Sequence, residues 1–514
     1  MTSRIEKSLR NIKFGLLSQI SILFLNLIVR SVFIRFLSID YLGINEVFHN
    51  ILSILNLAEM GFGTAIIYHF YEPLANNDED KLNSLMSLYK KVYYCIGIFI
   101  FITGSLLIPF LPFFINDIVD IPELSLIFIM FVIESSARYF FVYKQTFISV
   151  NQNEHIISKY NLITNVAIKS LQLFFLLMTR NFIFYLVIQL FGNLVLNLLL
   201  SKKADKLYPY LKSKKNAPIA YLEKKKIYRN IKAMLMHKIG GLLSNGIDIL
   251  LLSYFVNLAI VGLYSNYLMI LKSFLMIISI LFKSITASVG NFVATNPKKE
   301  IFNQFRIINF INFWLHAIVS ICLLILFDDF ITVWLGVEFL LPPLLVKIIV
   351  INFYLTGMRR SIWVFSDSLG LFWHDRYLPF FSTTIKLIST FLLINIFGAM
   401  GIFLGTTLSL LLSSFWFEPF ILFKFGFEKQ QKIYFGDYFL KVFVFLANYL
   451  IIHRLVLFIN VTGFLSFFFS SVLVFIISNL ILIFFYHKSS EFHYVVKILL
   501  GKHRTNMVDS KNRE

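Results

Sequence analysis

Residues 464–486 read FLSFFFSSVLVFIISNLILIFFY, a long run without a single charged side chain. A helix needs roughly 20 apolar residues to cross the hydrocarbon core of a bilayer. Similar runs, each bounded by charged residues, Gly or Pro, recur along the whole chain. Strands of a membrane barrel would be about 10 residues long, with strict alternation of apolar and polar side chains. These continuous runs therefore predict membrane-spanning helices and an all-α fold.

The composition indicates the same class of protein. The 514 residues are 58% hydrophobic and only 15% charged, with a mean hydropathy of +0.76. An ordinary soluble domain is about 25% charged. We therefore exclude a soluble enzyme, a nucleic-acid binder and a disordered scaffold, and we interpret the net charge of +19 through its distribution along the chain.

The apolar runs predict an all-α polytopic membrane protein with about fourteen transmembrane helices. They lie near residues 14–37, 44–67, 92–114, 123–143, 160–178, 182–200, 235–256, 263–285, 307–327, 342–362, 379–396, 401–423, 438–456 and 464–486.

Charges outside the spans predict the topology, because Lys and Arg are enriched on the cytoplasmic side of a membrane. If the N-terminus is cytoplasmic, nearly all of these cations fall in cytoplasmic segments, and the external side holds only Arg180 and Arg454. The external loops are acidic instead, with Asp40, Asp117, Asp120, Glu123, Asp328, Asp329 and Glu338. We expect both termini to be cytoplasmic.

The chain also contains an internal repeat. Aligning Gly43 with Gly262 brings further identities into register without a gap. These are Asn11-Ile12-Lys13 with Asn230-Ile231-Lys232, Phe36 with Phe255, and Leu52 with Leu271. A unit of six helices gives two copies of the same orientation, related by an axis along the membrane normal. The sequence thus predicts two six-helix lobes followed by two C-terminal helices.

The expected organisation follows from this repeat. It comprises an N-terminal lobe at 1–200, a basic cytoplasmic linker at 201–232, a C-terminal lobe at 233–423, two further helices within 424–486, and a basic cytoplasmic tail at 487–514. The linker is rich in Lys and Arg. It is either a site for the anionic headgroups of membrane lipids or a solvated connection that enforces the topology.

Several charged residues fall inside the predicted spans, where each costs about 2.5–3.5 kcal/mol on insertion scales. The cations are Arg30, Lys169, Lys272, Lys347 and Lys386, and the acids are Glu59 and Asp248. Since the cations prevail, a water-filled cavity that they line would favour an anionic substrate. Glu134 and Arg138 are spaced as a self-neutralising i, i+4 pair, which we expect to be structural.

Motifs for other chemistry are missing from the sequence. It contains no HExxH, CxxC pair, GxSxG or Walker loop. We therefore expect no metal site, no cofactor and no enzymatic activity. Transport would be driven by an ion gradient, the membrane potential or the substrate gradient.

Three short stretches resemble the N-terminal region of bacterial polysaccharide flippases. They are Tyr41-Leu42-Gly43-Ile44, Leu57-Ala58-Glu59-Met60-Gly61-Phe62-Gly63-Thr64-Ala65 and Tyr71-Glu72-Pro73-Leu74-Ala75. These flippases serve O-antigen, capsule and exopolysaccharide synthesis, and belong to the multidrug/oligosaccharidyl-lipid/polysaccharide exporter superfamily. The predicted helix count and lobe organisation resemble that family over the whole chain.

The resemblance implies two lobes around a cavity that opens alternately to either side of the bacterial inner membrane. Its basic residues would engage the pyrophosphate of an undecaprenyl-diphosphate-linked oligosaccharide. Arg30 matches the placement of cavity arginines in the family, and Lys169 and Lys272 match only as cations on cavity-facing helices. Coupling to H⁺ or Na⁺ is implied, with Glu59 and Asp248 as the candidate acids. Polysaccharide polymerase or assembly proteins are implied partners, and nucleic acid is not.

Two other functions stay open. A drug or small-metabolite exporter of the same superfamily would share the fold, but we would expect fewer cations and more aromatic side chains in its cavity. A membrane enzyme, such as a polysaccharide polymerase, would need acidic or basic residues in a substantial external loop. The external loops expected here are short and nearly free of Lys and Arg, which disfavours the enzyme.

Overall fold

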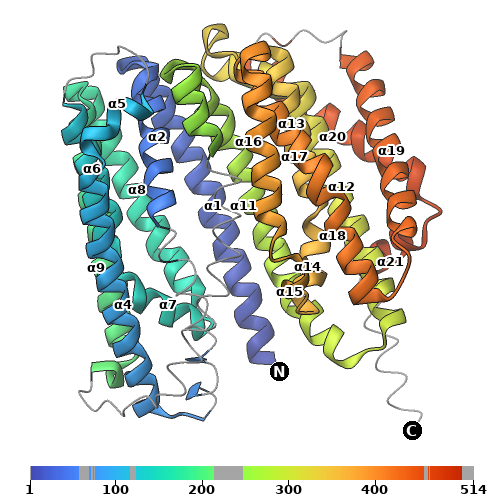
Figure 1. Cartoon of the computed structure of the whole chain (residues 1–514), viewed down its shortest axis with the longest axis horizontal. Helices are drawn as coiled ribbons and strands as arrows, with labels where there is room; N and C mark the ends of the chain where they lie inside the picture. The colour runs from blue at the N-terminus through green and yellow to red at the C-terminus, as the bar shows by residue number, and fades with distance from the viewer. Residues whose placement is uncertain are drawn as a thin grey trace. The chain divides into compact units, whose positions relative to one another are not determined.

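The structure is a computed structural model that describes residues 2–56, 59, 69–70, 73–74, 76–115, 123–212, 247–456, 461 and 463–499. Within these ranges the regular structure is helical and contains no strand (Figure 1). The chain divides into two compact units, Met1–Leu281 and Phe282–Glu514.

The first unit is built mainly from long helices. It contains α1 (Thr2–Phe36), α2 (Ile39–Leu55), α4 (Glu79–Leu106), η1 (Ile108–Phe110), α5 (Leu111–Phe114), α6 (Leu124–Arg138), α7 (Val142–Val150), α8 (Glu154–Thr179), α9 (Phe182–Leu207), η2 (Pro209–Lys212) and the first part of α11 (Leu258–Thr295). Helix α8 packs between α1 and α9, and α6 packs against both α4 and α9.

The second unit continues from α11 and has more short segments. Its helices are α12 (Lys298–Trp334), η3 (Val337–Phe339), α13 (Pro343–Met358), α14 (Arg360–Ser368), α15 (Phe372–Asp375), α16 (Leu378–Phe397), α17 (Ala399–Ser409), η4 (Leu410–Ser414), α18 (Phe415–Ile421), η5 (Leu422–Phe427), α19 (Lys432–Val456), α20 (Phe464–Tyr486) and α21 (Ser490–Leu499). Helix α12 contacts α13, α19 and α20, and α16 packs along α17.

The helices confirm the predicted all-α membrane fold. Among the described residues, 10 helices are long and apolar enough to cross a membrane, or 11 if α6 and α7, bent by 45°, form one span. Helix α2 and the pair α13–α14 occupy two further expected spans. The expected span at 235–256 lies outside the described residues up to residue 246, as do most of the linker and the tail beyond residue 499.

Several helices extend beyond the apolar runs that predicted them. The run at 263–285 belongs to α11, which has 38 residues and is therefore about 57 Å long, against a hydrocarbon core of about 30 Å. The run at 92–114 belongs to α4, which begins at an N-cap where the Asp78 carboxylate accepts a hydrogen bond from the Lys81 amide at 3.0 Å. The hydropathy of the sequence predicts only the part of a helix that crosses the bilayer, whereas capping groups determine where the helix begins and ends.

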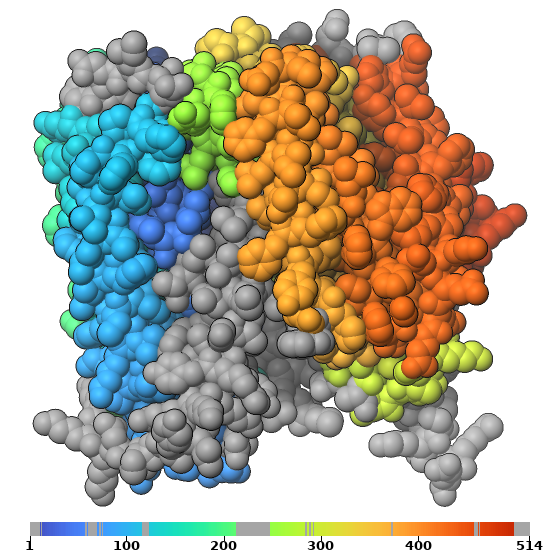
Figure 2. Space-filling model, in the orientation of Figure 1, coloured from blue at the N-terminus to red at the C-terminus, as the bar shows by residue number. Residues whose placement is uncertain are grey.

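Apolar side chains cover the outer surface of the second unit. Figure 2 shows the orange helices α16 to α18 as one continuous face. Ile388, Leu392, Ile396 and Trp416 of these helices are exposed, Ile396 to 72%. A water-soluble protein rarely exposes such a patch, so this surface is suited to contact with lipid chains.

In the first unit, two glycines bring α2 and α11 together near their first turns. A Cβ on Gly43 would overlap the carbonyl oxygen of Leu258, and a Cβ on Gly262 would overlap the carbonyl oxygen of Ile39. The alignment that pairs Gly43 with Gly262 also pairs Ile39 with Leu258. The contact is therefore reciprocal, as it is between two copies related by a two-fold axis.

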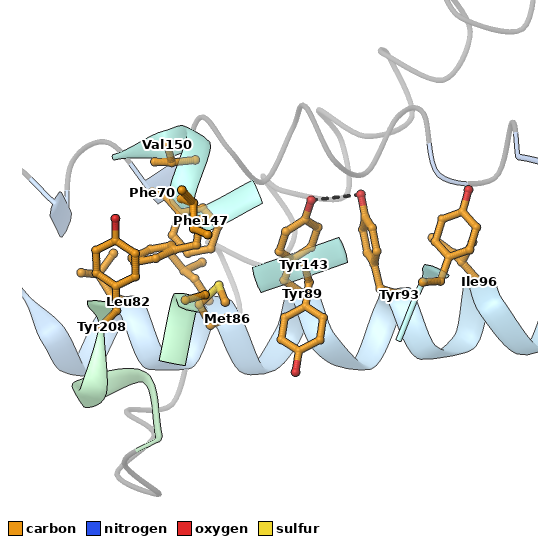
Figure 3. Close-up of a cluster of buried hydrophobic side chains, with 14 of the residues drawn as sticks. Phe70, Leu82, Met86, Tyr89, Tyr93, Ile96, Tyr143, Phe147, Val150 and Tyr208 are labelled. Carbon is orange, nitrogen blue, oxygen red and sulfur yellow. Dashed lines mark hydrogen bonds between the residues drawn. The ribbon is translucent and has the colours of Figure 1, made fainter. Parts of the chain in front are cut away.

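A cluster of aromatic side chains fills the space beside α4. Tyr89 and Tyr93 of α4 are buried with Phe147 of α7 and Phe70. Figure 3 shows the hydroxyls of Tyr89 and Tyr93 joined by a hydrogen bond of 3.0 Å. The Tyr93 hydroxyl in turn donates a hydrogen bond to the Glu59 carboxylate at 3.1 Å.

Candidate functional site

The candidate site is a cavity of about 540 Å³ within the unit Met1–Leu281. It lies among α1, α2, α8, α9 and α11, and a volume of this size is typical of small-molecule sites. Its titratable lining residues are Arg30, Glu46, His49, Lys169, Tyr185 and Lys272.

Arg30 of α1 has an incomplete set of partners. Its Nη2 donates a hydrogen bond to the Ser265 hydroxyl of α11 at 2.9 Å. Its Nε is buried and has no hydrogen-bond partner among the described residues, and neither has the Oδ1 of Asn45 in the same cavity. A buried polar atom without a partner costs about 1–3 kcal/mol. A bound polar ligand would remove that cost.

The two lysines of the cavity come from different helices. Lys169 of α8 lies with its Nζ 5.9 Å from the centre of the Tyr185 ring, within the range of a cation–π contact. Lys272 of α11 lies with its Nζ 3.5 Å from an oxygen of the Glu46 carboxylate on α2. Lys169 and Lys272 therefore line the same cavity as Arg30.

The structure brings together three of the five cations proposed from sequence. Arg30, Lys169 and Lys272 line the cavity. Lys347 and Lys386 belong to the unit Phe282–Glu514, where Lys347 is exposed on α13 and Lys386 is buried on α16. Sequence reasoning selected each residue because its charge falls within an apolar run, which cannot show which helices meet.

The two acids proposed for ion coupling are not among the described residues that line the cavity. Glu59 accepts hydrogen bonds from the hydroxyls of Tyr139 at 2.6 Å and Tyr93 at 3.1 Å. Asp248 is half-buried in the helical segment that precedes α11. The cavity acid is instead Glu46, which sequence reasoning did not select. The signal was present, because Glu46 and His49 lie on one polar face of the second predicted span.

Glu134 and Arg138 do not form the expected pair. The Glu134 carboxylate accepts hydrogen bonds from Gln189 at 3.1 Å and Asn193 at 2.6 Å, both on α9. No ion pair joins it to Arg138 within the described part of the chain. Partners on the neighbouring helix satisfy the carboxylate in place of the residue one turn away.

The second unit contains two sets of hydrogen-bonded charged side chains. Arg359 donates two hydrogen bonds to the Glu418 carboxylate, and Trp363 Nε1 donates a third at 3.1 Å. Lys441 of α19 is buried and donates to Asp437 at 2.7 Å. We interpret these contacts as fixing helix positions. Across both units, the described residues contain no group of three or more His, Cys, Asp or Glu suited to a metal.

No protein-family model matches the chain, and no curated protein matches its sequence. Solved structures do match. A mutant of the MATE transporter VcmN of Vibrio cholerae has a TM-score of 0.60 at 12% identity, covering 84% of this chain and 99% of that one. The lipid II flippase MurJ, in an inward closed conformation, has a TM-score of 0.55 at 14% identity, covering 93% of this chain and 99% of that one.

An inward-facing multidrug resistance MATE family transporter of the MOP superfamily is similar as well, with a TM-score of 0.56 at 12% identity over 77% of this chain and 95% of that one. At these identities the likeness shows the fold. The chain has the all-helical fold of the MATE and MurJ transporters and is a multi-pass membrane protein.

Proposed function

We propose that this protein is a flippase that moves undecaprenyl-diphosphate-linked oligosaccharide repeat units from the cytoplasmic to the outer leaflet. It would do so by alternating access, in the synthesis of a bacterial surface polysaccharide. One observation carries the proposal: Arg30, Lys169 and Lys272 come from three helices to one cavity, and the buried Nε of Arg30 lacks a partner there.

The chemistry of these groups suits a pyrophosphate. The planar Arg30 guanidinium presents several N–H donors to phosphate oxygens, and each lysine adds a compact point charge. The lipid chain would remain in the bilayer. The similarity in fold to a protein named lipid II flippase supports this substrate class.

Coupling to an ion gradient is part of the proposal. Glu59 and Asp248 are the proposed acceptors of H⁺ or Na⁺. Lys347 and Lys386 are retained as further candidate contacts of the anion in the second unit. The protein would work in the inner membrane with both termini in the cytoplasm, beside polysaccharide polymerase and assembly proteins, and would catalyse no bond chemistry.

Lipid analysis of a deletion strain tests this function. We expect the undecaprenyl-diphosphate oligosaccharide to accumulate on the cytoplasmic leaflet and the surface polysaccharide to disappear. The wild-type chain should restore export, whereas Arg30→Ala, Lys169→Ala and Lys272→Ala should each reduce it at least about tenfold at equal protein level. Lys90→Ala is the matched control, because Lys90 is exposed on α4 and lies over the Tyr94 ring. Unchanged export in all three cavity variants would refute the assigned site.

A small-molecule exporter is the second candidate. The same cavity is lined by Phe33, Met269 and Met276, and flexible methionines are common at promiscuous binding surfaces. Two of the similar structures are named as MATE transporters. Normal surface polysaccharide in the deletion strain, together with increased sensitivity to drugs, would favour this function over the flippase.

A further inference from the structure

Glu46 is the single carboxylate among the described residues that line the cavity. Its side chain is 17% exposed, whereas that of Lys272 is 59% exposed. The carboxylate lies 3.5 Å from the Lys272 Nζ. The cavity thus contains a carboxylate of the protein itself, next to a lysine that is proposed to bind the substrate.

We propose that Glu46 is an internal counter-ion that competes with the phosphate groups of the substrate for Lys272, and so sets the charge selectivity of the cavity. This inference rests on the function proposed above. It adds Glu46 to that function as a specificity-determining residue, which weakens the binding of the anion.

The charges of the cavity support this role. Among the Lys, Arg, Asp and Glu side chains that line the cavity, Arg30, Lys169 and Lys272 against Glu46 leave two positive charges in excess. A diphosphate diester carries two negative charges, so the match is closest for that headgroup, and a diphosphate monoester carries at most one more. A phosphate monoanion would leave one positive charge of the cavity without a counter-charge. Like-charge repulsion inside a cavity with low-dielectric walls is stronger than in water.

The difference in exposure indicates which partner moves. Glu46 is held on α2 among buried neighbours such as Val47 and Leu42, whereas Lys272 has a flexible stem and a largely exposed side chain. Lys272 can therefore turn from Glu46 to an incoming phosphate and return after release. The returning ion pair would keep Lys272 neutralised in the empty cavity and favour release of the anion.

Binding to the purified full-length protein in lipid nanodiscs tests the inference. The probe is farnesyl diphosphate, and farnesol serves as the ligand without charge. We expect Glu46→Gln to bind the diphosphate about tenfold more tightly than wild type, as removal of a coupled charge predicts. Farnesol binding should not change. The matched control is Asp205→Asn, which removes a carboxylate that pairs with Lys144 at 2.8 Å and does not line the cavity.

A double-mutant cycle separates this role from a structural one. Lys272→Gln alone should weaken diphosphate binding. Glu46→Gln should then have a much smaller effect in the Lys272→Gln background, because most of the competition acts through that lysine. Glu46→Asp keeps the charge and should bind like wild type, which provides a second variant if Glu46→Gln folds poorly.

The outcomes are distinguishable. If Lys272→Gln weakens binding but Glu46→Gln binds like wild type or more weakly, the counter-ion role is wrong and the flippase proposal stands. Equal weakening of farnesyl diphosphate and farnesol by Glu46→Gln would likewise refute the role, because it would indicate a packing effect. If wild type does not bind the diphosphate, or Arg30→Ala, Lys169→Ala and Lys272→Gln all bind it like wild type, the proposed function itself is contradicted.

Discussion

Arg359 and Glu418 form an ion pair in the second unit that is shielded from water. The Arg359 Nε donates to one Glu418 oxygen at 2.8 Å and the Nη2 donates to the other at 2.5 Å. Their side chains are only 16% and 10% exposed. Breaking such a pair by removing one partner costs about 3–5 kcal/mol, because a charge stays buried without compensation.

We therefore expect Arg359→Ala to lower the thermal unfolding temperature of the purified protein strongly, with Trp363 left bound to an uncompensated carboxylate. Replacing both partners together, as Arg359→Met with Glu418→Leu, should cost much less, since no charge is then left buried. Tryptophan fluorescence during heating in detergent measures both variants. A double variant as unstable as Arg359→Ala would show that packing, and not charge, dominates at this position.

Single residues also show what sequence spacing cannot decide. Glu134 and Arg138 have the spacing of a helical ion pair, yet Gln189 and Asn193 satisfy the carboxylate. Tertiary partners outweigh a local interaction that is worth only about 0.2–0.5 kcal/mol. The contact between Glu46 and Lys272 was missed for a related reason: periodicity identifies the polar face of each helix but not the helix that it meets.

At the scale of elements, the reciprocal contact of α2 and α11 depends on two glycines. We expect Gly43→Ala and Gly262→Ala each to destabilise the protein by about 1–3 kcal/mol and to reduce export, because the new Cβ would force the two helices apart. Gly→Ala inside a helix otherwise gains up to about 1 kcal/mol. Gly436→Ala on α19 is the matched control, since nothing lies within 4 Å of its added Cβ.

The double variant with Ala at both positions should cost less than the sum of the single changes, because either change already separates the helices. Thermal unfolding and complementation of the deletion strain measure these effects. Stabilities of Gly43→Ala and Gly262→Ala equal to that of Gly436→Ala would contradict the close contact.

The boundaries and internal regularity of the helices could not be predicted from the apolar runs. The apolar run at 401–423 predicts one helix, and the span Ala399–Phe427 contains two π-helical segments, η4 and η5, on either side of α18. Pro419 in α18 lacks the N–H that a regular helix would use. Hydropathy indicates that the segment is in the membrane but carries no information on its hydrogen-bond register.

At the scale of the whole molecule, the membrane class and the all-α fold could be predicted because they depend on composition and on run length alone. The positions of the spans in the sequence were predicted for the same reason. Each described helix that is long and apolar enough to cross a membrane overlaps an expected run. The cavity depends on which helices meet, so its cations were predicted individually but its acid was not. The topology and the lobe boundaries stay predictions.

Direct measurement of lipid translocation tests the central claim. The full chain is reconstituted in liposomes with a fluorescent undecaprenyl-diphosphate oligosaccharide, and the fraction reaching the opposite leaflet is followed with a membrane-impermeant quencher. We predict translocation by the wild type, stimulated by an ion gradient, and at least about tenfold slower translocation by Arg30→Ala. Lys90→Ala should resemble wild type. Translocation at the rate of protein-free liposomes, or a rate in Arg30→Ala equal to wild type, would contradict the flippase with its cationic cavity.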